Sequence, residues 1–121
     1  MLLYHFTDPV HWDQIFHAGR LDPEASNWTD DDTPKVLHLS RSEHVGTLPA
    51  THWGCVVRLL VDVDDDSVTN WIPWASAHGV SGLNYGGNGG DSREWWVSAA
   101  PIPSERWIEV ARCEWLRIWP E

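Results

Sequence analysis

Three short segments of the chain carry side chains that can bind a polar ligand or take part in acid–base chemistry. Residues 4–7 read Tyr-His-Phe-Thr, residues 38–40 read His-Leu-Ser, and residues 93–94 read Arg-Glu. A lone histidine in a strand more often makes one backbone hydrogen bond than it binds a ligand. Ser40 is equally well explained as a helix cap. The first two segments therefore indicate a ligand site only in combination with the third.

Glu94 is the most informative of these residues. It stands between Arg93 and two tryptophans, so we expect it in a partly buried strand, and a buried carboxylate needs a partner or a function. A surface glutamate paired with Arg93 is the alternative. Residues 84–90, just before it, hold four glycines and Tyr85, a composition that suits a loop covering a ligand.

The elements that position these segments can be predicted from local pattern. Residues 2–6 are a short apolar-aromatic strand, and residues 8–19 are a helix with Asp8 as its cap, Pro9 in its first turn and Gly19 at its end. Residues 36–40 and 93–98 are predicted strands, and residues 54–63 are a strand expected at the centre of the sheet. Ser40 and Glu43 have capping-box spacing, which predicts a short helix toward Leu48.

The remaining segments are predicted to be connections and a closing β-structure. Residues 20–34 are predicted to be a surface loop, residues 75–80 one helical turn, residues 101–103 a turn, and residues 107–119 one or two strands. The fold class is therefore α+β with one well-defined N-terminal helix.

Length and charge restrict the class of protein further. A chain of 121 residues suits one domain spanning residues 1–121, and 18 acidic against 8 basic residues give a formal net charge of −10. Broad binding of a nucleic-acid backbone is not expected at that charge, although a base or a strand end can still enter a pocket. No membrane span or signal peptide is apparent, and the two cysteines suit a reducing compartment, so we expect a cytoplasmic protein.

Taken in order, the segments resemble the ADP-ribosyltransferase superfamily, in particular its H-Y-E branch. The matching positions are Tyr4, His5 and Thr7 in the first strand, Gly19 and Leu21 after the helix, Val36 to Ser40 in the second strand, and Arg93, Glu94 and Trp95 after the flexible loop. The same pattern is close to a family of small uncharacterised bacterial proteins that shares this fold. Phe6 replaces the family's glycine, and the second-strand tyrosine is absent.

The resemblance implies a small split β-sheet core and NAD as the cofactor. Glu94 and His5 would be the catalytic residues, with Glu94 stabilising positive charge on the nicotinamide ribose and His5 contacting the adenosine ribose. The cofactor-binding positions implied are Tyr4, His5, Thr7, Ser40, Arg41, Tyr85 and Arg93, with Arg20 as a further candidate for the pyrophosphate. No metal is required by this chemistry.

The implied function is ADP-ribosyl transfer from NAD to a macromolecular target, or hydrolysis of NAD, by a toxin, an effector or a phage counter-defence protein. A non-catalytic module that binds a nucleotide or a protein stays open, supported by the missing tyrosine. An RNA 2′-phosphotransferase is a further alternative, which the scarcity of basic residues disfavours. The seven histidines lack paired metal-ligand spacing, so a metal site is not predicted.

Overall fold

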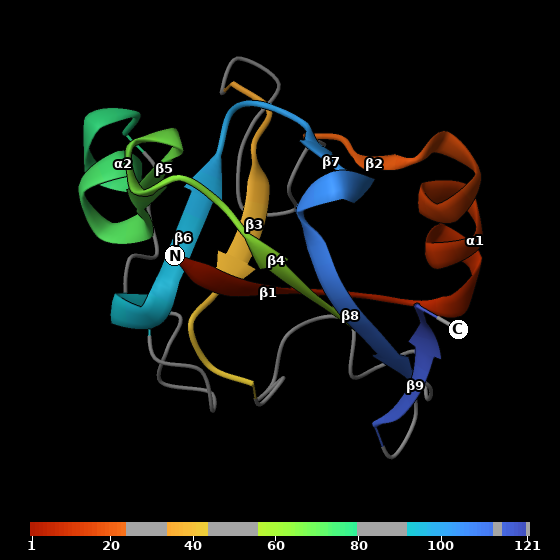
Figure 1. The fold of residues 1–121 in the computed structure, drawn as a ribbon. Coiled ribbons are helices and arrows are strands. Elements are labelled where there is room, and N and C mark those ends of the chain that lie inside the picture. The colour runs from red at the N-terminus through yellow and green to blue at the C-terminus, as the bar shows by residue number, and fades with distance from the viewer. Residues whose placement is uncertain (24–33, 44–55, 80–91, 113–114, 121) are drawn as a thin grey trace.

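The computed structural model describes residues 1–23, 34–43, 56–79, 92–112 and 115–120. Tyr85, the glycine-rich loop, both cysteines and the predicted helical segment from His44 to Leu48 lie outside the described residues. The described part is an α+β arrangement of two helices and a mostly antiparallel β-structure, shown in Figure 1. Neither of these two helices is long and apolar enough to cross a lipid bilayer.

Seven strands form one sheet in the order β5-β6-β3-β1-β4-β8-β9. All neighbours in it are antiparallel. The strand bounds are β1 Leu2–Thr7, β3 Leu37–Ser40, β4 Val57–Asp62, β5 Val68–Asn70, β6 Trp95–Ser98, β8 Trp107–Arg112 and β9 Leu116–Trp119. The short strands β2 (Arg20–Leu21) and β7 (Ile102–Pro103) pair separately, so the predicted turn at 101–103 contains a strand. The predicted central strand, β4, is interior, but β1 occupies the middle position.

The sheet has two halves that meet between β1 and β3. Strand β1 pairs with β4 along its whole length, from Leu2 opposite Asp62 to Thr7 opposite Val57, whereas its register with β3 is Tyr4 opposite Ser40. Figure 1 shows why the pairing is short, because β1 and β3 cross at a steep angle. Where they separate, the His5 side chain reaches across to the His38 carbonyl oxygen.

Two apolar clusters lie on opposite faces of β3. Alternation along a strand puts Leu37 and Leu39 on one face, in the larger cluster that Trp12 and Ile15 of helix α1 (Pro9–Ala18) cover. His38 and Ser40 face the other way, as do their partners Val97 and Trp95 on β6. That second face is covered by Trp71, Trp74 and Ala75, all from helix α2 (Trp71–Ala77).

Helix α1 confirms the capping prediction. The Asp8 side chain accepts the His11 backbone N–H at 2.8 Å, Pro9 stands in the first turn, and Gly19 ends the helix at a left-handed φ of 72°. Its capping N–H bonds back to the carbonyls of Ile15 and Phe16. Each of these signals acts within one turn of helix, which is why the sequence alone predicts both ends.

Helix α2 starts earlier than the sequence predicts. Pro73 suggests an interruption of the segment, but proline is tolerated in the first turn of a helix, and Asn70 caps it by accepting the Ile72 N–H at 3.2 Å. The prediction of a helix beginning at Ser40 also fails for residues 41–43, which are not helical. The Ser40 hydroxyl instead accepts the Ser42 N–H at 3.0 Å.

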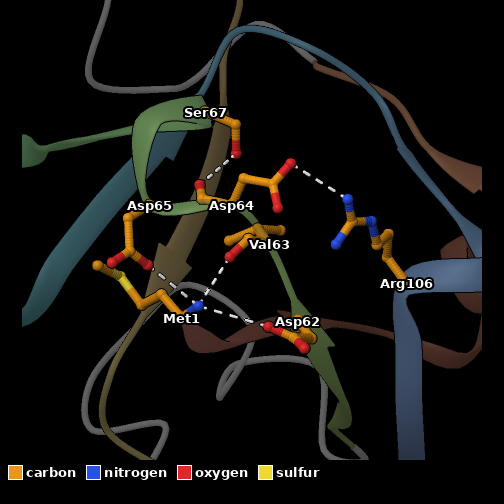
Figure 2. Close-up of polar contacts among 7 residues, drawn as sticks. All are labelled: Met1, Asp62, Val63, Asp64, Asp65, Ser67 and Arg106. Carbon is orange, nitrogen blue, oxygen red and sulfur yellow. Dashed lines mark hydrogen bonds and ion pairs between the residues drawn. The ribbon is translucent and has the colours of Figure 1, made fainter.

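Acidic side chains fix the start of β1. The Met1 ammonium group donates to the Val63 carbonyl at 2.7 Å and lies 3.4 Å from a carboxylate oxygen of Asp62 and 3.2 Å from one of Asp65 (Figure 2). The neighbouring Asp64 accepts from Arg106 at 3.1 Å instead. These contacts hold the N-terminus against the end of β4. The pKa of the Met1 amine is raised, and the hydrogen bond to Asp65 is the main cause.

Candidate functional site

A pocket of about 270 Å³ lies between α1, β1, β2 and the beginning of β3. Its polar walls come from His5 and Thr7 on β1, His11 and Gln14 on α1, and Arg20 and Asp22 at β2. Leu21, Val36 and Leu37 contribute apolar wall. The combination of an apolar lining and a few converging polar groups is typical of a small-molecule site.

His5 is held in one orientation at this pocket. Its Nδ1 atom lies 2.9 Å from the His38 carbonyl oxygen, and because a carbonyl only accepts, Nδ1 carries the proton in the neutral ring. The lone pair of the neutral imidazole is then on Nε2. Thr7, two residues along the same face of β1, is buried beside it.

His11 is oriented by the helix cap. Its Nδ1 atom lies 2.6 Å from Asp8 Oδ2, while Asp8 Oδ1 accepts the His11 backbone N–H. Burial by itself raises the pKa of Asp8. The hydrogen bonds from His11, the charge of His11 and the hydrogen bond from the Val10 N–H together outweigh burial, so the pKa of Asp8 is lowered. An imidazole fixed by a carboxylate at the pocket is the kind of group that transfers protons or binds anions.

His38 contributes to the pocket from β3, but its ring belongs to the second core. The ring centroid lies 5.4 Å from that of Trp71, and Val97 is its register partner on β6. Burial, followed by the nearby charge of His5, lowers the pKa of His38 to about 4. The ring is therefore neutral at physiological pH, which suits its apolar surroundings.

The predicted arginines are divided between two places. Arg20 lines the pocket and donates from Nε to both carboxylate oxygens of Asp22, at 2.9 and 3.2 Å. Arg41 and Arg93 lie beyond the other end of β3 and are exposed. The Arg93 carbonyl accepts from Asn70 Nδ2 at 3.0 Å, which ties that end of the sheet to the start of α2.

Tyr4 and Ser40 face away from the pocket. They are register partners and therefore share a face of the sheet, opposite to that of His5. The Tyr4 ring packs against Phe6 and Arg58, and the Ser40 side chain is buried. One ligand on one face of the sheet cannot contact both Tyr4 and His5, because adjacent residues of a strand point to opposite sides.

Glu94 is exposed, and the expectation of a partly buried strand position is wrong. It ends a short 3-10 helix, Ser92–Glu94, and the strand begins only at Trp95. Trp95 is buried against α2, but burial of the indole does not extend to the preceding turn. The Glu94 carbonyl accepts the Arg41 N–H at 2.9 Å, so the residue sits beside the end of β3.

The pocket and Glu94 thus lie at opposite ends of β3. Leu37 lines the pocket and Arg41 bonds Glu94, and at about 3.3 Å per residue this step spans roughly 13 Å. Sequence reasoning missed the α1 contribution to the pocket. Its signal is present in the sequence, because His11, Gln14 and Ala18 recur at helical spacing on one side of the predicted helix.

Among the residues that the structure describes, no group of three or more His, Cys, Asp or Glu side chains could hold a metal ion. No protein-family model, curated protein sequence or solved structure matches the chain. Function is therefore inferred from the residues and their geometry.

Proposed function

We propose that this protein binds NAD and transfers its ADP-ribosyl group to a macromolecular target or to water. One observation carries the proposal. The three segments that resemble the ADP-ribosyltransferase pattern lie on β1, on β3 and at the start of β6, which are far apart in the sequence but adjacent in the sheet. That adjacency is what a ligand shared by all three segments requires.

In this proposal the dinucleotide reaches from the pocket at the beginning of β3 to the surface at the other end of this strand, because both faces of β3 itself are covered by apolar clusters. The pocket is too small for a whole dinucleotide, so it takes the adenosine end, with His5 at the ribose and Arg20 near the pyrophosphate. The other end extends toward Arg41 and Glu94, roughly 13 Å further along the strand. Thr7 supports His5 from the neighbouring position on the same face.

Glu94 supplies the charge in the chemical step. The bond between nicotinamide and ribose breaks with its electron pair leaving on nicotinamide, and positive charge develops on the ribose. A carboxylate beside that ribose stabilises the charge, and the incoming oxygen or nitrogen nucleophile forms the new bond and loses its proton to solvent. Glu94 is exposed, so the bound ligand itself has to shield this carboxylate from water.

The direct test is to incubate the purified protein with NAD and measure nicotinamide release by chromatography. NAD labelled on the adenine, added together with cell lysate, shows whether the label is transferred to protein or nucleic acid. Release that depends on the protein supports the proposal, and label transfer separates a transferase from a hydrolase. Binding of NAD without any release would contradict the catalytic proposal.

A nucleotide-binding module without catalysis is the second candidate. Its support is the exposure of Glu94 together with Phe6, whose side chain is larger than the glycine of the resembled pattern. Under this candidate, calorimetry detects NAD or a related nucleotide at the pocket, and His5→Ala abolishes the heat of binding while nicotinamide is never released.

A further inference from the structure

An arginine stacked between two aromatic rings lies on the face of the sheet opposite to the pocket. The guanidinium carbon of Arg58 is 3.9 Å from the ring centroid of Trp115 and 5.2 Å from that of Tyr4. Phe6 packs 6.4 Å from Tyr4 and 6.5 Å from Trp115. We call Tyr4, Phe6, Arg58, Trp115 and Arg117 the arginine–aromatic face.

The register of the sheet puts these residues on one surface. Phe6 is opposite Arg58, Arg58 is opposite Ala111, and Ala111 is opposite Arg117, so one row crosses four strands from β1 to the edge strand β9. Among the described elements, helix α2 packs on this face against β5 and β6, and its Trp71 packs on His38 of β3. The half of the face that contains this row remains accessible at Trp115 and Arg117, both of which are exposed.

Trp115 is held in an unusual backbone conformation. Its φ is 59°, the single positive value among the described residues other than glycine, and bulky side chains adopt this region rarely because of steric cost. The residue is nevertheless 38% exposed although one face of its ring packs on Arg58. A partly exposed aromatic ring in such a sparsely populated backbone conformation is a candidate for a ligand contact.

The charges of this surface differ from those of the rest of the chain. Arg58 and Arg117 lie on it, in a protein with a net charge of −10. Glu109, half-buried opposite Leu60, and Asp62, exposed opposite Leu2, are the acidic side chains of the same face among the described strand residues. Arg58 also donates from Nη1 to the Glu43 carbonyl at 3.0 Å, and this hydrogen bond helps to orient the plane of the guanidinium group.

We propose that the arginine–aromatic face binds a short stretch of single-stranded nucleic acid. A base stacks on the exposed surface of Trp115, and the flanking phosphates contact Arg58 and Arg117. Stacking requires unpaired bases, which excludes a duplex, and the acidic remainder of the surface limits the contact to a few nucleotides. This inference is independent of NAD binding, because it concerns the opposite face of the sheet.

The test uses the intact protein and a fluorescein-labelled oligothymidylate of about ten nucleotides, followed by fluorescence anisotropy. We expect binding at low salt, with a slope of log K against log salt of about −1.4 for two phosphate contacts. The matching duplex should bind at least about tenfold more weakly, because its bases are not available for stacking. Absence of binding to the single strand at about 1 mM protein would overturn the proposal.

Variants localise the contact. Trp115→Asn removes the ring but retains a residue that tolerates positive φ, and should weaken binding roughly tenfold or more. Phe16→Ser removes an exposed aromatic ring on α1 and should leave binding unchanged. Arg117→Gln should reduce the salt slope by about 0.7, whereas Arg106→Gln, at the Asp64 contact, should not. Equal loss in test and control variants would contradict a specific face.

The indole N–H resonance of Trp115 gives a direct spectroscopic readout of this face. It is identified as the resonance missing from the spectrum of Trp115→Asn, and it should shift when the oligonucleotide is added. If Trp115→Asn does not fold, Arg117→Gln and the salt slope still decide the outcome. Shifts of the same resonance with protein concentration alone, without nucleic acid, would assign the face to a second copy of the chain and overturn the proposal.

Discussion

The Nδ1 atom of His5 lies 2.9 Å from the carbonyl oxygen of His38, and this hydrogen bond joins two strands that have already begun to separate. His5 thereby connects the two halves of the sheet, and its side chain also lines the pocket. The His38 ring, on the opposite side of β3, packs on Trp71. One short strand thus supports both the candidate site and the second core.

The buried His38 predicts a specific loss of stability in mild acid. Its pKa is about 4 in the folded protein, against about 6.5 when unfolded, so above pH 6.5 both states are neutral and His38 has no effect. As the pH falls from 6.5 to about 4, the unfolded chain binds a proton that the folded chain does not, and folding loses up to roughly 3 kcal/mol. Below about 4 no further loss arises from this residue.

Urea unfolding between pH 7.5 and 4.5 measures this loss, and His38→Leu is the variant that should reduce it. Asp8 does not interfere, because its lowered pKa makes it titrate below this window. An unchanged pH slope in His38→Leu would show that other groups cause the loss.

Removing the His5 ring should weaken both the sheet and the pocket. In His5→Ala the bond to the His38 carbonyl is lost, and we expect about 1 kcal/mol less stability in urea unfolding. His17→Ala is the matched control, since His17 also has its Nδ1 at a carbonyl, 2.7 Å from that of Asp13, but is 71% exposed. That variant should stay within about 0.5 kcal/mol. NAD affinity by calorimetry should fall in His5→Ala alone.

The carboxylate of Glu94 is predicted to be essential for nicotinamide release. Glu94→Gln preserves size and removes the charge, so turnover should fall by about two orders of magnitude or more while the melting temperature is unchanged. Glu105→Gln is the control, because Glu105 is also exposed in a 3-10 helix, Ser104–Arg106. Wild-type turnover in Glu94→Gln would remove this residue from the mechanism.

Asp65 is predicted to control the acidity of the Met1 amine. Its hydrogen bond is the largest cause of the raised pKa, so Asp65→Asn should lower the pKa of the amine toward its ordinary value. The stabilisation from this contact is present at neutral pH and is lost as the pH rises through the raised pKa. Asp64→Asn, which removes the Arg106 contact shown in Figure 2, should leave the pKa unchanged.

The pH dependence of amine acylation, followed by mass spectrometry, measures this pKa. Lys35 is the only lysine, so the two amines are readily distinguished. If both aspartate variants shift the pKa equally, general charge rather than the Asp65 hydrogen bond is responsible.

Local signals in the sequence are sufficient for the elements whose contacts lie within a few residues. The cap at Asp8, the proline at position 9 and the left-handed Gly19 define α1, and runs of apolar residues locate β1 and β4. The same kind of reasoning goes wrong where one residue is compatible with two structures. Pro73 suggests a helix breaker, but it stands in the first turn of α2, where proline is tolerated. The residues around Glu94 suggest a strand that includes it, but the strand begins only at the next residue, Trp95.

Only the tertiary structure decided which of these residues meet. His5 and His38 are 33 positions apart, and Arg58 and Trp115 come from distant parts of the chain, so no spacing rule relates them. Alternation states that neighbours in a strand face opposite ways, but the order of the strands determines which residues of different strands share a face. That order separated Tyr4 from His5, and it brought an arginine and three aromatic rings together on a surface that the sequence did not reveal.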